Sequence, residues 1–338
     1  MNRKKFLQYA ATAGIPLILP WDMAPTTVSE DESEAELTIG LVADAHQDIM
    51  HDCEERLAAF VAATLERQTD VNIQLGDFCF PIPDNKPFLN IWNQYKGPKY
   101  HVLGNHDMDV CTKAEVMDYW GMEAPHYSFD LKGYHFVVLD ANFLYLEGRF
   151  SDYAHGNFYI DDAFRTWIHP EQIDWLGADL RATNLPTIVF SHQGLAHDLW
   201  GVKNRRQIQL LLEAANEEAG FSKVIACFNG HNHVDDCRKI NGIYYVEMNS
   251  LSYQWLGEKY QCFTRYPKEI YERKPNLSKV APFRDPLYAL ITLSKGKIVI
   301  EGIESRWIGP SPSELGLPKN FYSIPYSPEI SDQLLKID

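Results

Sequence analysis

The stretch VLGNHD, residues 102–107, places an amide, an imidazole and a carboxylate directly after an apolar segment. The segment YHVL, Tyr100–Leu103, has the β-branched and aromatic content of a buried strand, and Gly104 ends it with a turn. The polar side chains are therefore predicted at the carboxyl end of a strand. Open α/β sheets bind ligands at this end, because the loops are exposed while the strands hold them in position.

Strand-like and helix-like segments alternate from Leu37 onward. LTIGLVAD (37–44) and VNIQLGD (71–77) are strand-like, and CEERLAAFVAATLERQ (53–68) between them has the apolar period of an amphipathic helix. This alternation predicts an α/β fold with a largely parallel sheet and crossover helices.

The later sequence adds two helices and several antiparallel strand pairs. Helices are predicted over HPEQIDWLGADLRAT (169–183) and RRQIQLLLEAANEEAG (205–220), the second ending at Gly220. Hairpins are predicted with turns at Lys132-Gly133, Asn241-Gly242 and Lys295-Gly296. Antiparallel pairs indicate a mixed sheet, or two sheets packed together.

Five apolar strands in succession end in side chains of the types that bind metals. Taken singly, a strand-end Asp usually caps a helix and a lone His is usually a hydrogen-bonded surface residue. The same placement on every strand instead indicates one shared site. The residues are Asp44 and His46, Asp77, Asn105 with His106 and Asp107, His192, and His231 with His233.

The order of these clusters resembles that of the calcineurin-like metallophosphoesterases, which read D-x-H, G-D, G-N-H-D, H and G-H-x-H. Here the motifs are DAH (44–46), GD (76–77), GNHD (104–107), SH (191–192) and GHNH (230–233), and the resemblance spans roughly residues 37–250. It implies two mixed β-sheets packed as a sandwich and flanked by helices, a four-layer arrangement.

The resemblance also implies two metal ions that share one carboxylate. One ion would bind Asp44, His46, Asp77 and His233. The other would bind Asp77, Asn105, His192 and His231. Imidazole nitrogen with carboxylate and amide oxygen suits divalent transition ions such as Mn, Fe, Zn or Co, whereas an all-oxygen set would suit Mg or Ca.

A bridging carboxylate would hold two such ions about 3.5–4 Å apart, and the ions would lower the pKa of the water expected to attack phosphorus. His106, next to a ligand but not a ligand in the family pattern, is the predicted general acid for the leaving oxygen. Asp107 is predicted to orient His106 and raise its basicity, the alternative being a turn residue that bonds its own backbone.

The predicted activity is hydrolysis of a small phosphodiester or pyrophosphate, such as a nucleotide or a phosphorylated alcohol. The first alternative is a phosphomonoesterase. The second, from a different functional class, is a non-catalytic binding module on the same fold. Many relatives continue G-D-x-x-D or G-D-x-x-N, but Phe80 stands at that last place here, which leaves the subgroup open.

Composition limits the partners. With 31 Lys and Arg against 46 Asp and Glu the net charge is -15, and no basic stripe is present. A nucleic-acid polymer is therefore not expected as a partner, because phosphate backbones are bound by clustered Lys and Arg. No stable protein partner is predicted.

Residues 1–25 combine a basic start, NRKKFLQ, with a short uncharged run, which indicates an export signal of a twin-arginine-like kind or a retained N-terminal anchor. Export would place the protein in the periplasm or outside the cell. Residues 26–36 are predicted as an acidic linker, 37–305 as the phosphoesterase domain and 306–338 as a C-terminal extension.

Overall fold

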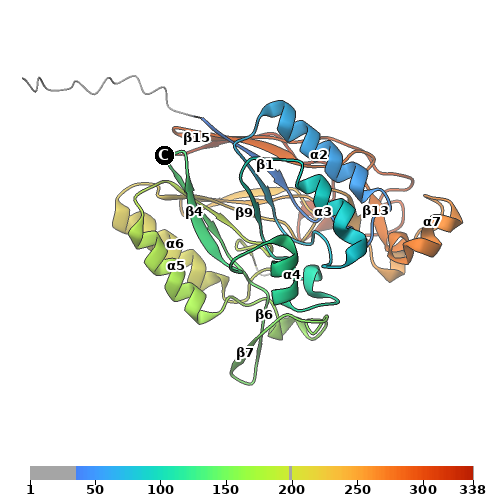
Figure 1. Ribbon diagram of the computed structural model, residues 1–338, viewed down its shortest axis with the longest axis horizontal. Helices are drawn as coiled ribbons and strands as arrows, with labels where there is room; N and C mark the ends of the chain where they lie inside the picture. The colour runs from blue at the N-terminus through green and yellow to red at the C-terminus, as the bar shows by residue number, and fades with distance from the viewer. Residues whose placement is uncertain (1–35, 198–199, 338) are drawn as a thin grey trace, which may run out of the picture. The chain divides into compact units, whose positions relative to one another are not determined.

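The computed structural model describes residues 36–197 and 200–337 (Figure 1). The predicted export signal, 1–25, and residues 26–35 of the predicted linker lie outside the described residues.

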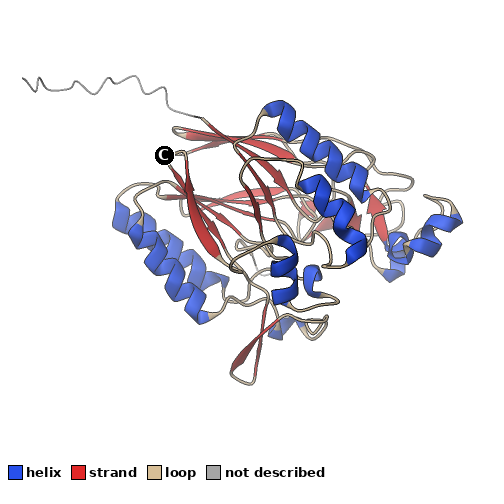
Figure 2. Ribbon diagram, in the orientation of Figure 1, coloured by secondary structure: helices blue, strands red, loops and turns tan. Residues whose placement is uncertain are grey.

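Two six-stranded mixed sheets form the centre of the described residues. The first has the order β18-β15-β14-β1-β2-β3, and the second β10-β11-β9-β8-β5-β4. Figure 2 shows helices α2 and α3 beside one sheet and α5 and α6 beside the other. This is the four-layer sandwich that the resemblance implied.

The first sheet contains the strand that opens the predicted domain. Strands β1, β2 and β3 run parallel, while β14, β15 and β18 continue the sheet antiparallel from β1. The bounds are β1 (Leu37–Val42), β2 (Val71–Gln74), β3 (Lys99–His101), β14 (Ala289–Ser294), β15 (Lys297–Glu301) and β18 (Gln333–Lys336), with α2 (Cys53–Arg67) and α3 (Lys86–Trp92) as crossovers.

Two expectations need correction here. The strand predicted over Tyr100–Leu103 covers Lys99–His101, although the Val102 amide still donates to the Gln74 carbonyl at 3.0 Å. The segment predicted as a C-terminal extension contributes β18, which pairs with β15 at the edge of the first sheet. A domain boundary at residue 305 would therefore divide this sheet.

The second sheet is parallel through its middle. Strands β5, β8, β9 and β11 pair in parallel, and β4 and β10 close the two edges antiparallel. The bounds are β4 (Tyr127–Leu131), β5 (Tyr134–Val138), β8 (Thr187–Phe190), β9 (Val224–Asn229), β10 (Asp236–Ile240) and β11 (Ile243–Glu247), with α5 (Pro170–Ala182) and α6 (Arg205–Ala219) as the flanking helices.

The predicted local signals are found in the structure. The three hairpins are β4–β5, β10–β11 and β14–β15, and each turn contains a glycine with positive φ. Helix α6 ends at Gly220, whose φ of 73° suits glycine and whose amide bonds the last helical carbonyls. Local turn chemistry therefore sets these boundaries.

Successive strand residues pack into different layers because neighbouring side chains point to opposite faces. Phe136 of β5 packs between the sheets with Ile39 of β1. Its neighbour Val137 packs outward with Leu176 of α5 and Ile208 of α6. Both faces of the central strands β5, β8 and β9 are therefore buried, which explains their nearly continuous apolar sequences.

Shorter elements complete the described residues. They are α4 (Lys113–Trp120), α7 (Lys268–Arg273), β6 (Phe143–Leu146), β7 (Arg149–Asp152), β12 (Tyr253–Trp255), β13 (Val280–Pro282), β16 (Asn320–Phe321), β17 (Ile324–Pro325) and five 3-10 helices at Pro83–Asn85, His106–Met108, Asp162–Phe164, Glu258–Tyr260 and Pro275–Lys279. Over the described part of the chain, none of the helices combines the length and apolarity that a membrane crossing requires.

Candidate metal centre

The loops after β1, β2, β3, β8 and β9 bring the predicted ligands into two adjoining groups. Asp44, His46 and His233 form one, and Asp77, His192 and His231 form the other. Within each group, the ligand atoms lie within 4.8 Å of one another.

Asp77 connects the two groups. Its Oδ2 lies 3.6 Å from Nε2 of His46 and 3.2 Å from Nε2 of His192. The Asn105 side chain joins the second group, with Oδ1 3.2 Å from the same His192 nitrogen. The structure thus brings all seven predicted ligands together.

The backbone of this region is strained. Five of the seven predicted ligands have positive φ, a left-handed conformation that costs a non-glycine residue free energy: Asp44 (51°), His46 (53°), Asp77 (50°), His231 (77°) and His233 (53°). Such conformations persist only where the surroundings enforce them. They turn these side chains from the strand ends toward a common point.

Two motif glycines allow the loops to approach closely. A Cβ on Gly104 would lie 2.1 Å from the Asp77 amide nitrogen, and one on Gly230 would lie 2.4 Å from Oδ2 of Asp44. Any larger residue would therefore displace a predicted ligand. The glycines of G-N-H-D and G-H-N-H are required by this packing.

The imidazole orientations suit cation binding. Nδ1 of His192 donates to the Leu75 carbonyl at 2.7 Å, and Nδ1 of His233 donates to the Tyr253 carbonyl at 2.9 Å. Each Nε2 therefore faces the carboxylates and is the ring atom that would bind a metal ion, the orientation found in metal-bound histidines. His192 Nε2 also lies 3.2 Å from His231 Nδ1, so one cation could bind both nitrogens in place of the proton between them.

The electrostatics of the site also favour cations. Burial opposes a charge on His192, but Asp77 and Asp44 outweigh it and raise its pKa to about 9. Burial and the charge of His192 lower the pKa of His231 to about 3. The neighbouring imidazoles hold the pKa of Asp77 well below its usual range against the effect of its burial. The donors and charges present therefore fit divalent transition ions.

His106 lies beside these groups with a side chain that is 33% exposed. Its backbone amide donates to Oδ1 of Asp77 at 2.8 Å, and its ring centroid lies 5.4 Å from that of His46. Nδ1 lies 2.9 Å from Oδ2 of Asp109 and 3.2 Å from the Tyr159 hydroxyl. Burial opposes its charge, but Asp77 and Asp109 raise the pKa of His106 to about 10.

The prediction that Asp107 orients His106 is wrong. The Asp107 carboxylate is buried and accepts backbone hydrogen bonds from Phe78 (2.7 Å), Gly104 (2.8 Å) and Asp77 (3.0 Å). These bonds hold the loops after β2 and β3 together. The Asp107 carboxylate thus resembles the alternative given for it above, a turn residue that forms hydrogen bonds with the backbone.

Sequence reasoning missed Asp109 and Tyr159. Asp109 follows His106 by three residues across the 3-10 helix His106–Met108, a spacing that places side chains on one face. Tyr159, which is 62% exposed, donates to Asp109 at 3.1 Å. The i, i+3 spacing of His106 and Asp109 was a local signal, whereas nothing in the sequence near Tyr159 indicated this contact.

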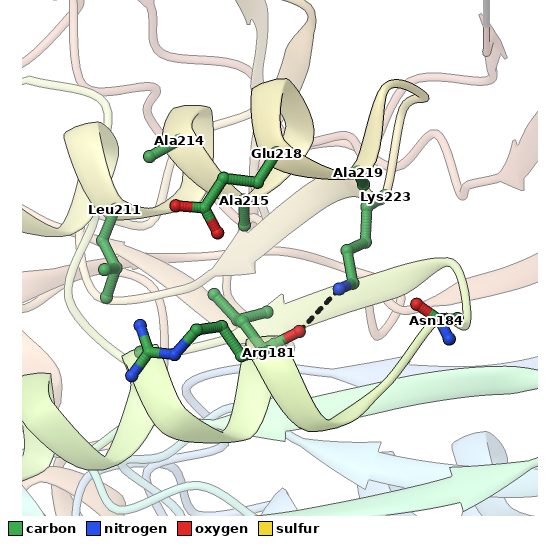
Figure 3. A pocket seen from close by; sticks show the side chains of 10 residues that line it. Arg181, Asn184, Leu211, Ala214, Ala215, Glu218, Ala219 and Lys223 are labelled. Atoms are coloured by element: carbon green, nitrogen blue, oxygen red, sulfur yellow. Dashed lines mark hydrogen bonds between the residues drawn. The ribbon is translucent and has the colours of Figure 1, made fainter.

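A separate hollow of about 200 Å³ lies between α5 and α6. Figure 3 shows Arg181 and Glu218 on its walls. Lys223, also in this lining, donates to the Leu180 carbonyl at 2.6 Å. None of the predicted site residues lines it. The strand-end clusters therefore remain the candidate site.

The sequence profile described as calcineurin-like phosphoesterase matches residues 37–235. The chain belongs to this family. The resemblance seen in the motifs is thereby confirmed. Calcineurin-like phosphoesterases hydrolyse phosphoric esters and normally bind divalent metal ions, and the candidate ligand clusters of this chain agree with that membership.

Solved structures of other proteins superpose on this chain. A dimetal phosphatase from Danio rerio is 16% identical, with 81% of this chain and 99% of that chain covered and a TM-score of 0.56. GAP50, the anchor in the inner membrane complex of Plasmodium, is 15% identical, with 90% of both chains covered and a TM-score of 0.51. At such identities the likeness concerns the fold. Among curated proteins, none matches the chain.

Proposed function

We propose that the protein is a dinuclear, metal-dependent phosphohydrolase that acts on a small phosphodiester or pyrophosphate, such as a nucleotide or a phosphorylated alcohol. The observation that supports this most is the position of Asp77, whose Oδ2 lies between His46 and His192 of the two ligand groups. A carboxylate in that position can bridge two ions.

The seven residues would hold the ions in the sets implied by the family pattern. Asp44, His46 and His233 would bind one ion and Asn105, His192 and His231 the other, with Asp77 common to both. Two divalent ions bound there would lower the pKa of a shared water and neutralise charge on the phosphoryl oxygens.

His106 would supply the proton to the leaving oxygen. It is partly exposed beside both ligand groups, so a substrate can reach it, and its neighbours favour the protonated imidazole. Asp109 would orient the ring by accepting from Nδ1, which directs Nε2 to the substrate. Tyr159 would limit the movement of Asp109.

A test starts with chelator-treated protein reloaded with Mn²⁺, Fe²⁺, Co²⁺ or Zn²⁺. Alkyl and aryl diesters, monoesters and nucleotide diphosphates are then compared as substrates, with Asp77→Ala as the variant. We expect diester or pyrophosphate hydrolysis that depends on metal and is lost in the variant. Preference for monoesters would favour the phosphomonoesterase alternative.

Absence of hydrolysis by the metal-loaded protein on every substrate would favour the binding-module alternative. The Plasmodium neighbour is named for anchoring, so the shared fold alone does not establish catalysis. Full metal content and full rate in Asp77→Ala would refute the dinuclear centre.

His106→Ala tests the acid separately. An alkyl leaving group needs protonation, whereas an activated aryl leaving group departs without it. We expect alkyl diester hydrolysis to fall about 10²–10⁴-fold and aryl ester hydrolysis to fall less, with metal content unchanged. Equal losses on both substrates together with loss of an ion would show that His106 holds metal instead.

A further inference from the structure

A second cluster of ligand-type side chains lies outside the candidate dinuclear centre. His197 comes from the loop after β8, Asp236 begins β10 and Glu247 ends β11. One ligand atom from each lies within 4.8 Å of the other two, and Nε2 of His197 lies 3.2 Å from Oε2 of Glu247. The loop after β8 and the β10–β11 hairpin thus converge on one point.

The two carboxylates of this cluster are direct cross-strand neighbours. Asp236 and Glu247 oppose each other in the antiparallel β10–β11 ladder. Like charges directly opposite each other destabilise a sheet, and burial strengthens their repulsion. The Glu247 side chain is only 5% exposed and that of Asp236 21% exposed. A cation between them would remove this repulsion.

The protein partners compensate these charges only in part. Arg238, whose side chain is 40% exposed, donates to Oδ2 of Asp236. Glu247 has contacts with the Asn232 amide and the His197 imidazole. Neither of these two partners has a permanent positive charge.

Asn232 provides an independent observation. It is 3% exposed, and its Nδ2 donates to Oε1 of Glu247, so its amide group lies at the cluster. Its Oδ1 has no hydrogen-bond partner among the described residues, although a buried amide oxygen normally has one. In the structure Nδ2, not Oδ1, faces Glu247. A bound cation would favour a half-turn of the amide that exchanges this hydrogen bond for a contact between Oδ1 and the ion.

We propose that His197, Asp236 and Glu247 bind one further divalent cation, with the Asn232 oxygen as an additional ligand. One imidazole nitrogen among carboxylate oxygens suits Zn²⁺ or a similar transition ion, whereas Ca²⁺ and Mg²⁺ prefer oxygen alone. The ion is separate from the dinuclear centre and does not depend on it.

This ion would hold two loops of the dinuclear centre in position. His197 shares its loop with His192, and Asn232 stands between His231 and His233. A cation at the cluster therefore ties the edge strand β10 and its neighbour β11 to two loops that contain predicted ligands of the dinuclear centre. It would stabilise those loops without contacting substrate.

The test is a count of bound Zn²⁺. Wild type, His197→Gln and Glu247→Gln are stripped with a chelator, dialysed against buffered Zn²⁺ and analysed for zinc per chain by mass spectrometry. His197→Gln alters a loop residue whose side chain is 19% exposed, and Glu247→Gln keeps an acceptor for Asn232, so both are expected to fold. Circular dichroism checks this for each protein.

Asp179→Asn is the matched control. Asp179 and Asp130 also flank a histidine, but they contact opposite ring nitrogens of His135, at 2.9 Å and 2.6 Å. The two carboxylates therefore lie on opposite sides of the imidazole ring and cannot bind one ion together with it. The same four proteins are prepared in an Asp77→Ala background, in which the dinuclear centre should be impaired.

We expect His197→Gln and Glu247→Gln each to bind one Zn²⁺ fewer than their parent in both backgrounds, and Asp179→Asn to match the parent. The proposal is overturned if either cluster variant keeps the stoichiometry of its parent, or if Asp179→Asn loses an ion as well. Failure of the dinuclear centre would appear instead as equal zinc content in wild type and Asp77→Ala.

Discussion

Asp107 and Asp109 stand two residues apart and are predicted to have opposite mutant phenotypes. The Asp109 carboxylate accepts a hydrogen bond from Nδ1 of the partly exposed His106, and the buried Asp107 carboxylate accepts hydrogen bonds from three backbone amides. Asp109→Asn should therefore reduce catalysis with little effect on stability. Asp107→Asn should reduce stability first.

The cost of Asp107→Asn follows from how its oxygens are used. Oδ1 accepts from Phe78, while Oδ2 accepts from Asp77 and Gly104. Asparagine has one acceptor oxygen, so its best orientation loses one bond and turns an NH₂ group toward an amide donor. A hydrogen bond contributes about 0.5–1.5 kcal/mol and a buried amide left without a partner costs about 1–3 kcal/mol, so the free energy of unfolding should fall by about 2–4 kcal/mol.

The expected effect of Asp109→Asn is a lower rate of hydrolysis. Asparagine still accepts from Nδ1 of His106 but no longer stabilises the positive imidazole. Removing an orienting carboxylate of this kind usually costs about 10–100-fold in activity, which corresponds to about 1.4–2.7 kcal/mol. The loss should be larger for alkyl than for aryl diesters, because only the former need the proton.

Urea unfolding measures stability, and steady-state rates on an alkyl and an aryl diester measure catalysis. If Asp109→Asn left the alkyl rate unchanged while Asp107→Asn reduced it at full stability, the contacts seen here would not be those used in catalysis. The original prediction for Asp107 would then be restored.

Three further predictions concern other parts of the chain. Gly104→Ala should lose bound metal, measured by mass spectrometry, because its Cβ would meet the Asp77 amide at 2.1 Å, while Gly133→Ala, a turn glycine with open space around it, should retain the metal. Burial opposes the charge of His135, but hydrogen bonds to Asp179 and Asp130 raise its pKa, so its ion pair with Asp179 stabilises the fold fully below pH 6.5 and less as the pH rises through the raised pKa. The free energy of unfolding of Asp179→Asn should therefore be about 1–2 kcal/mol below that of wild type in urea titrations near pH 5.5. This difference should shrink at higher pH, and a difference that grew would contradict the reasoning. We also propose that residues 1–25 direct export: deleting them should leave a folded, active enzyme in the cytoplasm, and fractionation that found the full-length protein there, soluble and unprocessed, would count against the signal.

The sequence alone predicted those features that depend on neighbouring residues. Hairpin turns at Lys132-Gly133 and Asn241-Gly242 depend on positive φ within two residues, so they can be read locally. The predicted ligands could be found because each directly follows an apolar strand. Parallel strands present their carboxyl ends at one edge, so a pattern repeated along the chain implies a meeting in space.

Tertiary structure alone decided which partner each side chain has. Asp107 and Asp109 are the same residue type beside the same histidine, and the turn of the 3-10 helix directs one inward to backbone amides and the other outward to His106. His197 and Glu247 lie 50 residues apart and meet because β11 pairs with β9 beside the loop after β8. Such contacts depend on packing between elements, which the spacing of residues along the chain does not encode.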